Sequence, residues 1–302
     1  MRFQYISDTH LEKSNARMPP LQPVAENLIL GGDIGNPNSQ KYKALLEEAS
    51  KKFKNVFLIA GNHEFSKKTV SETREAIQEV TSSLANVFFL DNTAYDFPDS
   101  DITIFGTTLW TPIPEKFDAS KVSDHRHIRG FTLEARNALH SQARADIVTH
   151  VLGRPHRRFV VVTHHVPRHF LASKEFDNNP LNCAYVTDVP ELDSENIVAV
   201  VYGHTHTAHA FQKYRCSPIG HPGENRTPCY TASFEIGRRI PRVLPDWRAA
   251  PFHPAGFTIV PSPVSPPPTS TKVTATLGID KLMRQLCAVT IDTPLVYVPC
   301  GS

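Results

Sequence analysis

Five short segments of the chain carry carboxylate, amide and imidazole side chains of the kind that bind metal ions. They are Asp8-Thr9-His10, Gly32-Asp33, Gly61-Asn62-His63-Glu64, Thr163-His164-His165 and Gly203-His204-Thr205-His206. Their donor atoms are oxygens and imidazole nitrogens, with no thiolate among them. Mixed nitrogen and oxygen ligation suits manganese, iron or zinc. These segments therefore indicate a divalent metal centre.

Each segment directly follows a short apolar run. The runs span residues 3–6, 28–30, 56–60, 159–162 and 198–202. Short apolar runs bounded by glycine or polar residues predict strands that are buried on both faces, as in a parallel sheet. Parallel strands bring their carboxyl ends to one edge of the sheet, where ligands bind in open α/β folds. We therefore expect the five segments to lie side by side.

No single segment would establish a metal site. An Asp after a strand is more often a turn residue or a helix cap, and a lone His is more often a hydrogen-bonded core residue. Five such segments in register, however, form a joint pattern that chance rarely produces. So many carboxylates and imidazoles close together need compensating charge, which a pair of divalent cations supplies.

The intervals between these segments show helical and strand patterns. Apolar spacing predicts helices that begin at Pro37-Asn38, over residues 70–84 and from Thr132 to about Leu152. Short strands are expected at residues 87–90, 95–97 and 102–105. Residues 107–130 show no periodicity, and long loops of this kind are usually functional or disordered. The alternation of strands and helices indicates an α/β fold.

Composition is ordinary for a soluble protein: 302 residues, 21% charged and 40% apolar, with a formal net charge of +2. That charge gives no support for a nucleic-acid partner. The N-terminus has no apolar signal region, and no apolar run approaches the ~20 residues that span a bilayer. The cysteines are scattered without a CxxC pair, so reduced thiols are expected. We expect a cytoplasmic protein without membrane association, and the sequence indicates no particular oligomeric state.

The ordered series of motifs resembles the calcineurin-like metallophosphoesterases. The resemblance covers about residues 1–210, and the stretch 122–140 is similar to a group of uncharacterised microbial and fungal members. It implies a four-layer α-β-β-α sandwich with two mixed sheets and a dinuclear metal site at the carboxyl ends of the strands. It also implies a role for each ligand. One metal would be held by Asp8, His10 and His206, the other by Asn62, His164 and His204, with Asp33 bridging both.

This ligand set implies hydrolysis of a small phosphomonoester or phosphodiester. Two cations ~3.5–4 Å apart can share a hydroxide at neutral pH, and that hydroxide would attack phosphorus in line. His63 would act as the catalytic residue that stabilises charge or protonates the leaving oxygen, the alternative being a simple turn residue. Glu64 is expected to stabilise its turn. His165 is either a substrate contact or a surface residue.

One departure from related phosphatases narrows the substrate. Phosphoprotein phosphatases share the Gly-Asn-His-Glu turn, but their bridging Asp precedes a segment ending in Asp-Arg-Gly, whose Arg binds phosphate. Here Asp33 is followed by residues 34–38 without an Arg, which disfavours a protein serine/threonine phosphatase. Arg126 and Arg129 would supply the phosphate contact instead, because Arg forks match phosphate geometry. The alternative is that both are solvated surface residues.

Two other functions stay open from the sequence. A catalytically weak scaffold of the same fold would have lost ligands, but all seven positions carry competent residue types. A nuclease would need a basic groove with interleaved aromatic residues, and no basic run lies beside the motifs.

The last third of the chain departs from the family pattern because it is dense in Pro and Ser. Such composition cannot continue a strand ladder and favours extended or disordered chain. We therefore expect a phosphoesterase domain over residues 1–215 and a poorly ordered Pro/Ser-rich region over residues 216–302. The alternative is that segments such as residues 229–236 supply a strand to the sheet.

Overall fold

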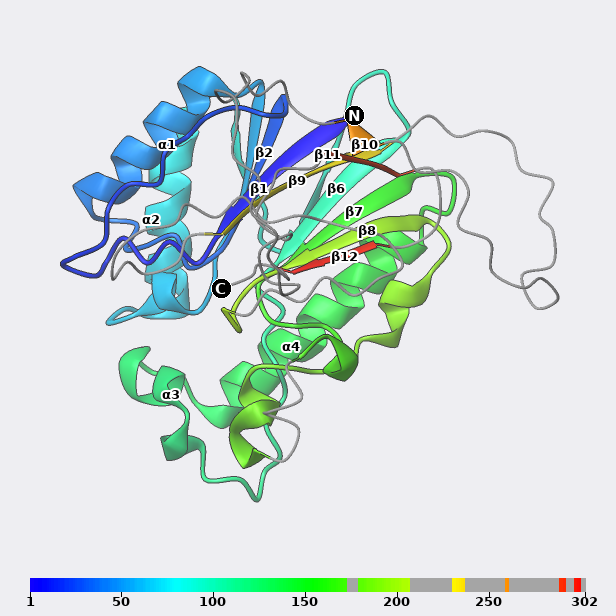
Figure 1. Ribbon diagram of the computed structural model, residues 1–302. Helices are drawn as coiled ribbons and strands as arrows, with labels where there is room; N and C mark the ends of the chain where they lie inside the picture. Colours follow the sequence, from blue (N-terminus) through cyan, green and yellow to red (C-terminus); the bar gives the residue numbers. More distant parts are fainter. Residues whose placement is uncertain (173–178, 207–229, 237–258, 261–287, 292–295, 300–302) are drawn as a thin grey trace, which may run out of the picture.

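The computed structural model describes residues 1–172, 179–206, 230–236, 259–260, 288–291 and 296–299. Its strands form two sheets (Figure 1). The first contains β1 (Arg2–Ser7), β2 (Asn27–Gly31), β3 (Asn55–Ile59), β4 (Val87–Phe89), β9 (Tyr230–Ile236), β10 (Ile259–Val260) and β11 (Ala288–Ile291). The second contains β5 (Thr93–Asp96), β6 (Ile102–Thr107), β7 (Arg158–Thr163), β8 (Ile197–Tyr202) and β12 (Val296–Pro299).

Both sheets are mixed, as expected. The strand orders are β10-β11-β9-β1-β2-β3-β4 and β12-β8-β7-β6-β5. Strands β1 to β4 pair in parallel, as do β6, β7 and β8. The antiparallel neighbours are β9 against β1, β10 against β11 and β5 against β6. The parallel strands therefore carry the predicted ligand segments at their carboxyl ends. Three segments follow strands of the first sheet and two follow strands of the second, so the prediction of one edge of a single sheet is wrong.

Four α-helices accompany the sheets in the described part of the chain. They are α1 (Gln40–Lys52), α2 (Val70–Ser82), α3 (Ser123–His127) and α4 (Leu133–Ile147). Short helical turns connect other parts of the described chain: η1 (His63–Phe65), η2 (Ala119–Lys121), η3 (Val148–Leu152), η4 (His169–Leu171), η6 (Pro180–Ala184) and η7 (Pro190–Asp193). Helices α1 and α2 lie on one side of the two sheets, and α4 lies on the other (Figure 1).

Three apolar clusters establish the order of the layers. Tyr5 of the first sheet and Ile104 of the second belong to the cluster between the sheets. Leu30 on the opposite face of the first sheet packs in a cluster with Leu45 of α1. The outer face of the second sheet packs on α4 in a third cluster, which includes Val161. Successive side chains of a strand face opposite sides of the sheet. A strand covered by another layer on both sides therefore needs a continuous apolar run. The order helix, sheet, sheet, helix is that of the expected sandwich.

Side-chain caps set the starts of the helices. The side chain of Thr132 accepts a hydrogen bond from the N–H of Ala135 at 3.2 Å, so α4 begins where it was predicted. The start predicted at Pro37-Asn38 is wrong, because Ser39 caps α1 instead and the helix begins at Gln40. The predicted end near Leu152 is also only partly right: α4 ends at residue 147 and the last five residues form the π-helical turn η3.

Residues 107–130, for which no periodicity was found, contain the short elements η2 and α3. A helix of five residues is too short to show a repeat of 3.6 residues in its sequence. This segment also contacts the rest of the fold through its backbone, since the N–H of Arg129 donates to the carbonyl of Lys68 at 2.9 Å. The segment is therefore an ordered part of the fold rather than an open loop.

Segments beyond residue 216 contribute strands to both sheets. Strand β9 pairs with β1, with Tyr230 opposite Ser7, and β12 pairs in parallel with β8. The alternative that residues 229–236 supply a strand is therefore confirmed. The expectation of poor order in the Pro/Ser-rich region falls largely on residues that lie outside the described part of the chain, and the domain boundary at residue 215 stays a prediction.

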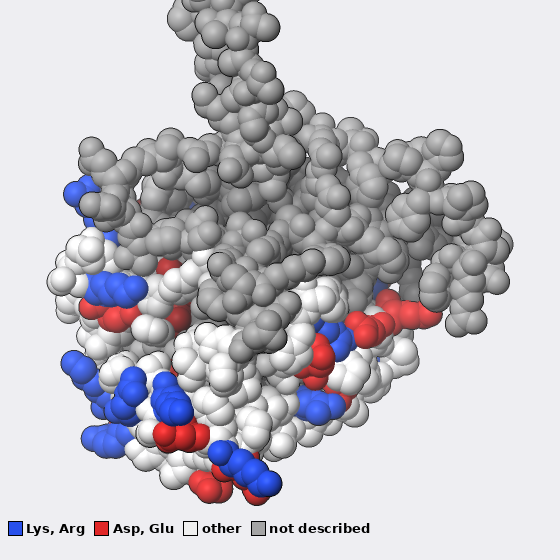
Figure 2. Space-filling view, turned by 60° about the horizontal axis from the view of Figure 1, so that its bottom comes forward, with Lys and Arg blue, Asp and Glu red and all other residues white. Residues whose placement is uncertain are grey.

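Charges of both signs are mixed on the described surface. In Figure 2, basic side chains lie beside acidic ones over the described residues in view. Ion pairs such as that between Arg154 and Asp96, at 2.9 Å, connect neighbouring elements. None of the helices in the described part of the chain combines the length and the apolar composition that a bilayer crossing requires.

The carboxylate of Glu64 connects the turns that follow β2 and β3. Its Oε2 accepts hydrogen bonds from the N–H groups of Asp33 at 3.0 Å and Gly61 at 2.8 Å. Its Oε1 accepts from the N–H groups of Ile34 at 2.7 Å and Gly35 at 3.3 Å. Glu64 thus stabilises its own turn, as predicted, and also fixes the neighbouring turn that carries Asp33.

We expect Glu64→Gln to lower the free energy of unfolding by about 3 kcal/mol, because the amide NH2 would face backbone donors that now bind a carboxylate. Urea denaturation measures this value. Glu48→Gln is the matched control, since Glu48 forms only a partly exposed pair with Lys52 at 2.6 Å, and its change should stay within about 0.5 kcal/mol. Equal effects of the two substitutions would contradict the role assigned to Glu64.

Candidate metal centre

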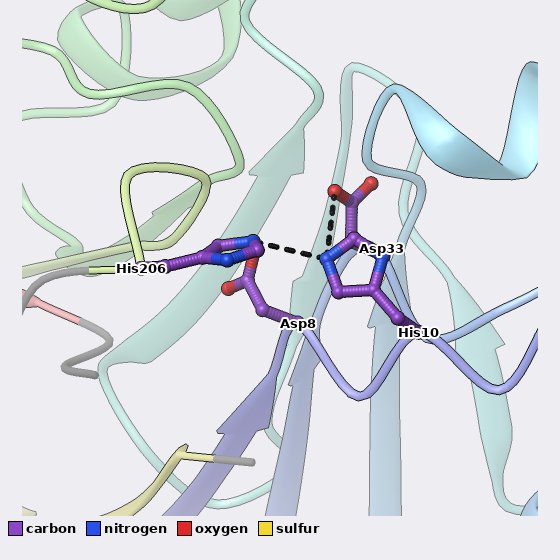
Figure 3. Close-up of side chains that lie close together, drawn as sticks. All are labelled: Asp8, His10, Asp33 and His206. Atoms are coloured by element: carbon purple, nitrogen blue, oxygen red, sulfur yellow. Dashed lines mark hydrogen bonds and ion pairs between the residues drawn. The ribbon is translucent and has the colours of Figure 1, made fainter. Parts of the chain in front are cut away.

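Four of the predicted ligands form a cluster beyond the ends of β1, β2 and β8 (Figure 3). Asp8, His10, Asp33 and His206 each place one ligand atom within 4.8 Å of the others. His10 Nε2 lies 2.9 Å from His206 Nε2 and 3.8 Å from Asp33 Oδ2. His206 Nε2 lies 3.3 Å from Asp8 Oδ1. The first cluster therefore combines two imidazoles with two carboxylates.

A second cluster shares Asp33 with the first. His164 Nε2 lies 3.4 Å from Asp33 Oδ1 and 3.2 Å from His204 Nδ1. The same nitrogen lies 3.2 Å from the amide Oδ1 of Asn62. Asp33 thus presents Oδ2 to the first cluster and Oδ1 to the second. All seven predicted ligands are brought together in this way.

The imidazoles are oriented so that lone pairs face the centres of the clusters. His10 Nδ1 lies 2.9 Å from the carboxylate Oε1 of Glu12, and His164 Nδ1 lies 3.0 Å from the carbonyl oxygen of Gly31. Both partners are acceptors, so each Nδ1 donates and each neutral ring keeps its lone pair on Nε2. When the rings are neutral, these lone pairs converge with carboxylate oxygens, an arrangement that suits a cation. The residues present therefore fit divalent metal ions.

The electrostatic field of the clusters also favours cations. Burial lowers the pKa of His164, but the charge and hydrogen bond of Asp33 outweigh it and raise this pKa to about 10. Burial raises the pKa of Asp33, but the charges of His164 and His63 outweigh it and hold the pKa well below its ordinary value. A site that attracts a proton this strongly attracts a metal ion for the same reason, because both carry positive charge.

Burial also affects His204, whose pKa lies well below its ordinary value. Desolvation is the largest cause, and the nearby rings of His165 and His164 add repulsion. The imidazole of His204 is therefore neutral at physiological pH. A neutral imidazole offers the lone pair that ligation needs.

Five of the proposed ligands have a left-handed backbone, which residues other than glycine rarely adopt. The φ angles are 54° at Asp8, 47° at His10, 51° at Asp33, 77° at His204 and 52° at His206. Each such residue costs on the order of 1–3 kcal/mol and persists only where the surrounding structure fixes it. Strain of this kind concentrates at functional sites, so the backbone supports a functional role for these turns.

Glycine is required where the turns approach one another. A Cβ atom on Gly61 would lie 2.2 Å from Asp33 Oδ1, and one on Gly32 would lie 2.6 Å from His164 Nδ1. Gly32 also has a φ of 89°. The two glycines that precede Asp33 and Asn62 therefore leave the space in which the ligands meet.

His63 lies beside both clusters. Its side chain is 41% exposed, its Nδ1 lies 3.1 Å from Glu12 Oε1, and its ring contacts that of His10 edge-on at 4.5 Å. Its backbone N–H donates to Asp33 Oδ1 at 2.8 Å. Burial lowers the pKa of His63, but Asp33 and Glu12 outweigh it and raise this pKa to about 9. The ring is thus adjacent to the ligands and accessible from solvent.

His165 is fully buried, so the alternative that it is a surface residue is wrong. Its Nδ1 lies 3.1 Å from the carbonyl oxygen of Thr108. Its ring packs 4.2 Å from that of His204 and 5.2 Å from that of Trp110. His165 therefore supports a ligand ring, and its contact with substrate stays a prediction.

Arg126 and Arg129 are exposed. Arg126 donates to the carbonyl oxygen of Ser120 at 2.8 Å, and Arg129 pairs with Glu72. Within the described residues, none of the contacts recorded for these two side chains involves a proposed ligand. Their role in binding phosphate stays a prediction.

Glu12 lies outside the predicted set but contacts two members of it. Its Oε1 receives hydrogen bonds from Nδ1 of both His10 and His63. Burial raises the pKa of Glu12, but these hydrogen bonds outweigh it and lower the pKa to about 2. The only sequence signal for Glu12 was its position two residues after a ligand histidine.

Two further residues outside the predicted set lie behind Asn62. Asp124 Oδ1 accepts a hydrogen bond from Asn62 Nδ2 at 2.8 Å. Asp124 Oδ2 accepts from Arg136 at 2.8 Å, and the Arg136 side chain is fully buried. Both residues fall in the stretch 122–140, whose resemblance to uncharacterised family members was the available signal.

The sequence model of the calcineurin-like phosphoesterase family matches residues 1–208. The chain therefore belongs to this family, and it is a phosphoester hydrolase with a cluster of side chains that could bind metal. It is 23% identical over 243 residues to an uncharacterised protein of Acanthamoeba polyphaga mimivirus, a match that covers 69% of this chain and 86% of the relative.

Among solved structures, the fold is similar to that of phosphopantetheinyl hydrolase from Mycobacterium tuberculosis. The TM-score is 0.54 at 16% identity, over 69% of this chain and 84% of the other. At this level of identity the likeness concerns the fold alone.

Divalent metal should stabilise the folded protein, because the two clusters form only when β1, β2, β3, β7 and β8 are assembled. A ligand that binds only the folded state, present at about 100 times its Kd, adds about 2.7 kcal/mol to the free energy of unfolding. We expect this change in urea denaturation when Mn²⁺ is added to protein dialysed against EDTA. His206→Ala should lose part of the gain, whereas His156→Ala, at an exposed turn, should keep it. Equal gains in both variants would contradict the assignment of His206.

Proposed function

We propose that the protein hydrolyses a small phosphomonoester or phosphodiester at a dinuclear metal centre. The carrying observation is the carboxylate of Asp33, whose two oxygens face two separate clusters of ligand atoms. Manganese, iron or zinc suits these donors. One ion would be held by Asp8, His10 and His206 and the other by Asn62, His164 and His204, with Asp33 common to both.

When bound, a pair of divalent cations supplies a water of lowered pKa for in-line attack on phosphorus and neutralises the phosphoryl oxygens. The protein's own contribution is to hold the donors in place before substrate arrives. Glu64 fixes the backbone of Asp33, and Glu12 fixes the ring orientation of His10.

His63 is the proposed proton donor to the leaving oxygen. Its Nδ1 faces Glu12, which leaves Nε2 to carry the proton that is transferred. Its backbone N–H is held by Asp33, so the ring stays next to the ligands while its outer edge is accessible. This combination of a fixed backbone and an accessible ring is what a general acid requires.

The observations favour this function over the two alternatives. A scaffold with a dead site would not need five strained ligand turns, which carry a cost in stability. A nuclease would need a continuous basic groove, and the described surface in Figure 2 mixes basic with acidic side chains.

We expect hydrolysis of an aryl phosphomonoester or a bis-aryl phosphodiester only in the presence of a divalent metal, with no activity on single-stranded DNA. Asp33→Ala should abolish activity, because Asp33 is the residue common to both clusters. Asp118→Ala, which removes an exposed carboxylate, should retain full activity. Release of the aryl alcohol measures both. Activity of metal-stripped protein, or of Asp33→Ala, would sink the proposal.

We expect His63→Gln to lower kcat by roughly 10²–10⁴, the usual worth of a positioned acid, while metal content stays unchanged. His127→Gln is the control, because His127 is exposed on α3, and its kcat should match that of the wild type. Elemental analysis alongside the kinetics separates the two roles of His63. Loss of one metal equivalent would show that His63 is a ligand.

A further inference from the structure

Asn62 presents its two amide atoms to different partners. Its Oδ1 lies 3.2 Å from His164 Nε2 in the second cluster, and its Nδ2 donates to Asp124 Oδ1 at 2.8 Å. An amide oxygen has lone pairs for a cation, whereas the NH2 group has only donors to offer. A half-turn of the amide would exchange the two atoms and place NH2 in the metal site. Some constraint must therefore fix the orientation of this side chain.

The carboxylate of Asp124 supplies that constraint. Because an ionised carboxylate only accepts hydrogen bonds, the atom of Asn62 that faces it must be the nitrogen. Asp124 is itself held from the other side, where Oδ2 accepts from Arg136 at 2.8 Å. The three side chains thus form a directional series in which two donors converge on one acceptor.

Arg136 is fixed by the core of the protein. Its side chain is fully buried near the N-terminal end of α4. It donates to the carbonyl oxygen of Thr111 at 2.9 Å, to the Thr111 hydroxyl at 2.9 Å and to the carbonyl oxygen of Ala184 at 2.8 Å. Its guanidinium also lies over the ring of Trp110, 5.2 Å from the centroid. These contacts fix the position of the Arg136 guanidinium, and its hydrogen bond to Asp124 fixes that carboxylate in turn.

A buried ion pair of this kind needs an explanation other than stability. The desolvation of two charges offsets most of their attraction, and well-packed apolar side chains often serve stability equally well. An apolar pair, however, cannot accept a hydrogen bond from Asn62, so it would leave both orientations of the Asn62 amide open.

We propose that Arg136, acting through Asp124, is a positioning residue that selects the oxygen of Asn62 as a ligand of the second metal. This inference rests on the proposed dinuclear centre and concerns only the ion held by His164 and His204. Neither Asp124 nor Arg136 touches the first cluster in the contacts of the described residues.

The isosteric change Asp124→Asn provides the sharpest test. Arg136 would draw the new amide oxygen to itself, so the new NH2 group would face Asn62. Two NH2 groups cannot bond to each other, and Asn62 would turn its oxygen away from the metal site. Loss of a partner behind a ligand costs about 10–100-fold in metal affinity. We expect a loss of metal affinity of about 100-fold at the second site, and unchanged metal affinity at the first site.

Calorimetric titration of EDTA-dialysed protein with Mn²⁺ measures the two sites without relying on activity. Wild type should bind two equivalents tightly, and Asp124→Asn should bind one. Arg136→Lys leaves the carboxylate of Asp124 in place but removes the forked guanidinium that holds it. We therefore expect roughly 10-fold weaker binding of the second equivalent of Mn²⁺. Arg144→Gln is the matched control, because Arg144 lies on the same helix and pairs with Glu191 instead. It should bind both equivalents as wild type does.

The outcomes separate this inference from the function on which it rests. A wild type that binds fewer than two equivalents would overturn the dinuclear centre, and the positioning role with it. Two tight equivalents in wild type and also in Asp124→Asn would overturn the positioning role alone. Circular dichroism checks folding, and if Asp124→Asn does not fold, Arg136→Lys decides. Unchanged binding of both equivalents in that variant would again overturn the proposal.

Discussion

The geometry of the candidate metal centre depends on the carboxylate of Glu64. This carboxylate contacts the backbone of the predicted ligand Asp33 rather than its side chain. One of its oxygens accepts from the backbone of Asp33 and from that of Gly61. The ends of β2 and β3 are therefore held at a fixed separation. The carboxylate of Asp33 and the amide of Asn62 start from these two turns, so the placement of Asn62 relative to Asp33 within the second cluster follows from this interaction.

Three carboxyl side chains lie behind the predicted ligands. Glu12 accepts from a ligand imidazole, Asp124 from the ligand amide and Glu64 from the ligand backbone. Each carboxylate orients one ligand, because it can only accept and therefore dictates which atom faces it. Glu12, whose pKa is lowered to about 2 by its hydrogen bonds with His10 and His63, also adds negative charge around a site for cations. The predicted ligands alone therefore give an incomplete account of the candidate centre, because the carboxyl groups behind them orient their donor atoms.

The sequence was sufficient to predict the ligand segments that follow the strands. It was insufficient to predict the buried side chains and the distant strand that support these segments. The apolar runs before Asp8, Asp33 and His164 are local features. Parallel pairing of β1 with β2 brings Asp8 and Asp33 together. Strand β7 belongs to the second sheet, so the approach of His164 depends on the packing of the two sheets against each other. Arg136, by contrast, has an ordinary helical context, and its burial depends on contacts 25 and 48 residues away. Strand β9 was obscured in the same way, because its pairing partner β1 lies at the other end of the chain. The ligand roles themselves are still predictions.

The first cluster has a consequence for the order of events during synthesis. His10 and His206 are 196 residues apart in the chain, and contacts of such separation form only after the intervening segment has closed. On the ribosome, Asp8 and His10 lack their contacts with His206 until residue 206 has emerged. The complete first cluster is therefore available to a metal ion only late in synthesis. This contrasts with small zinc domains, in which the ion itself drives folding.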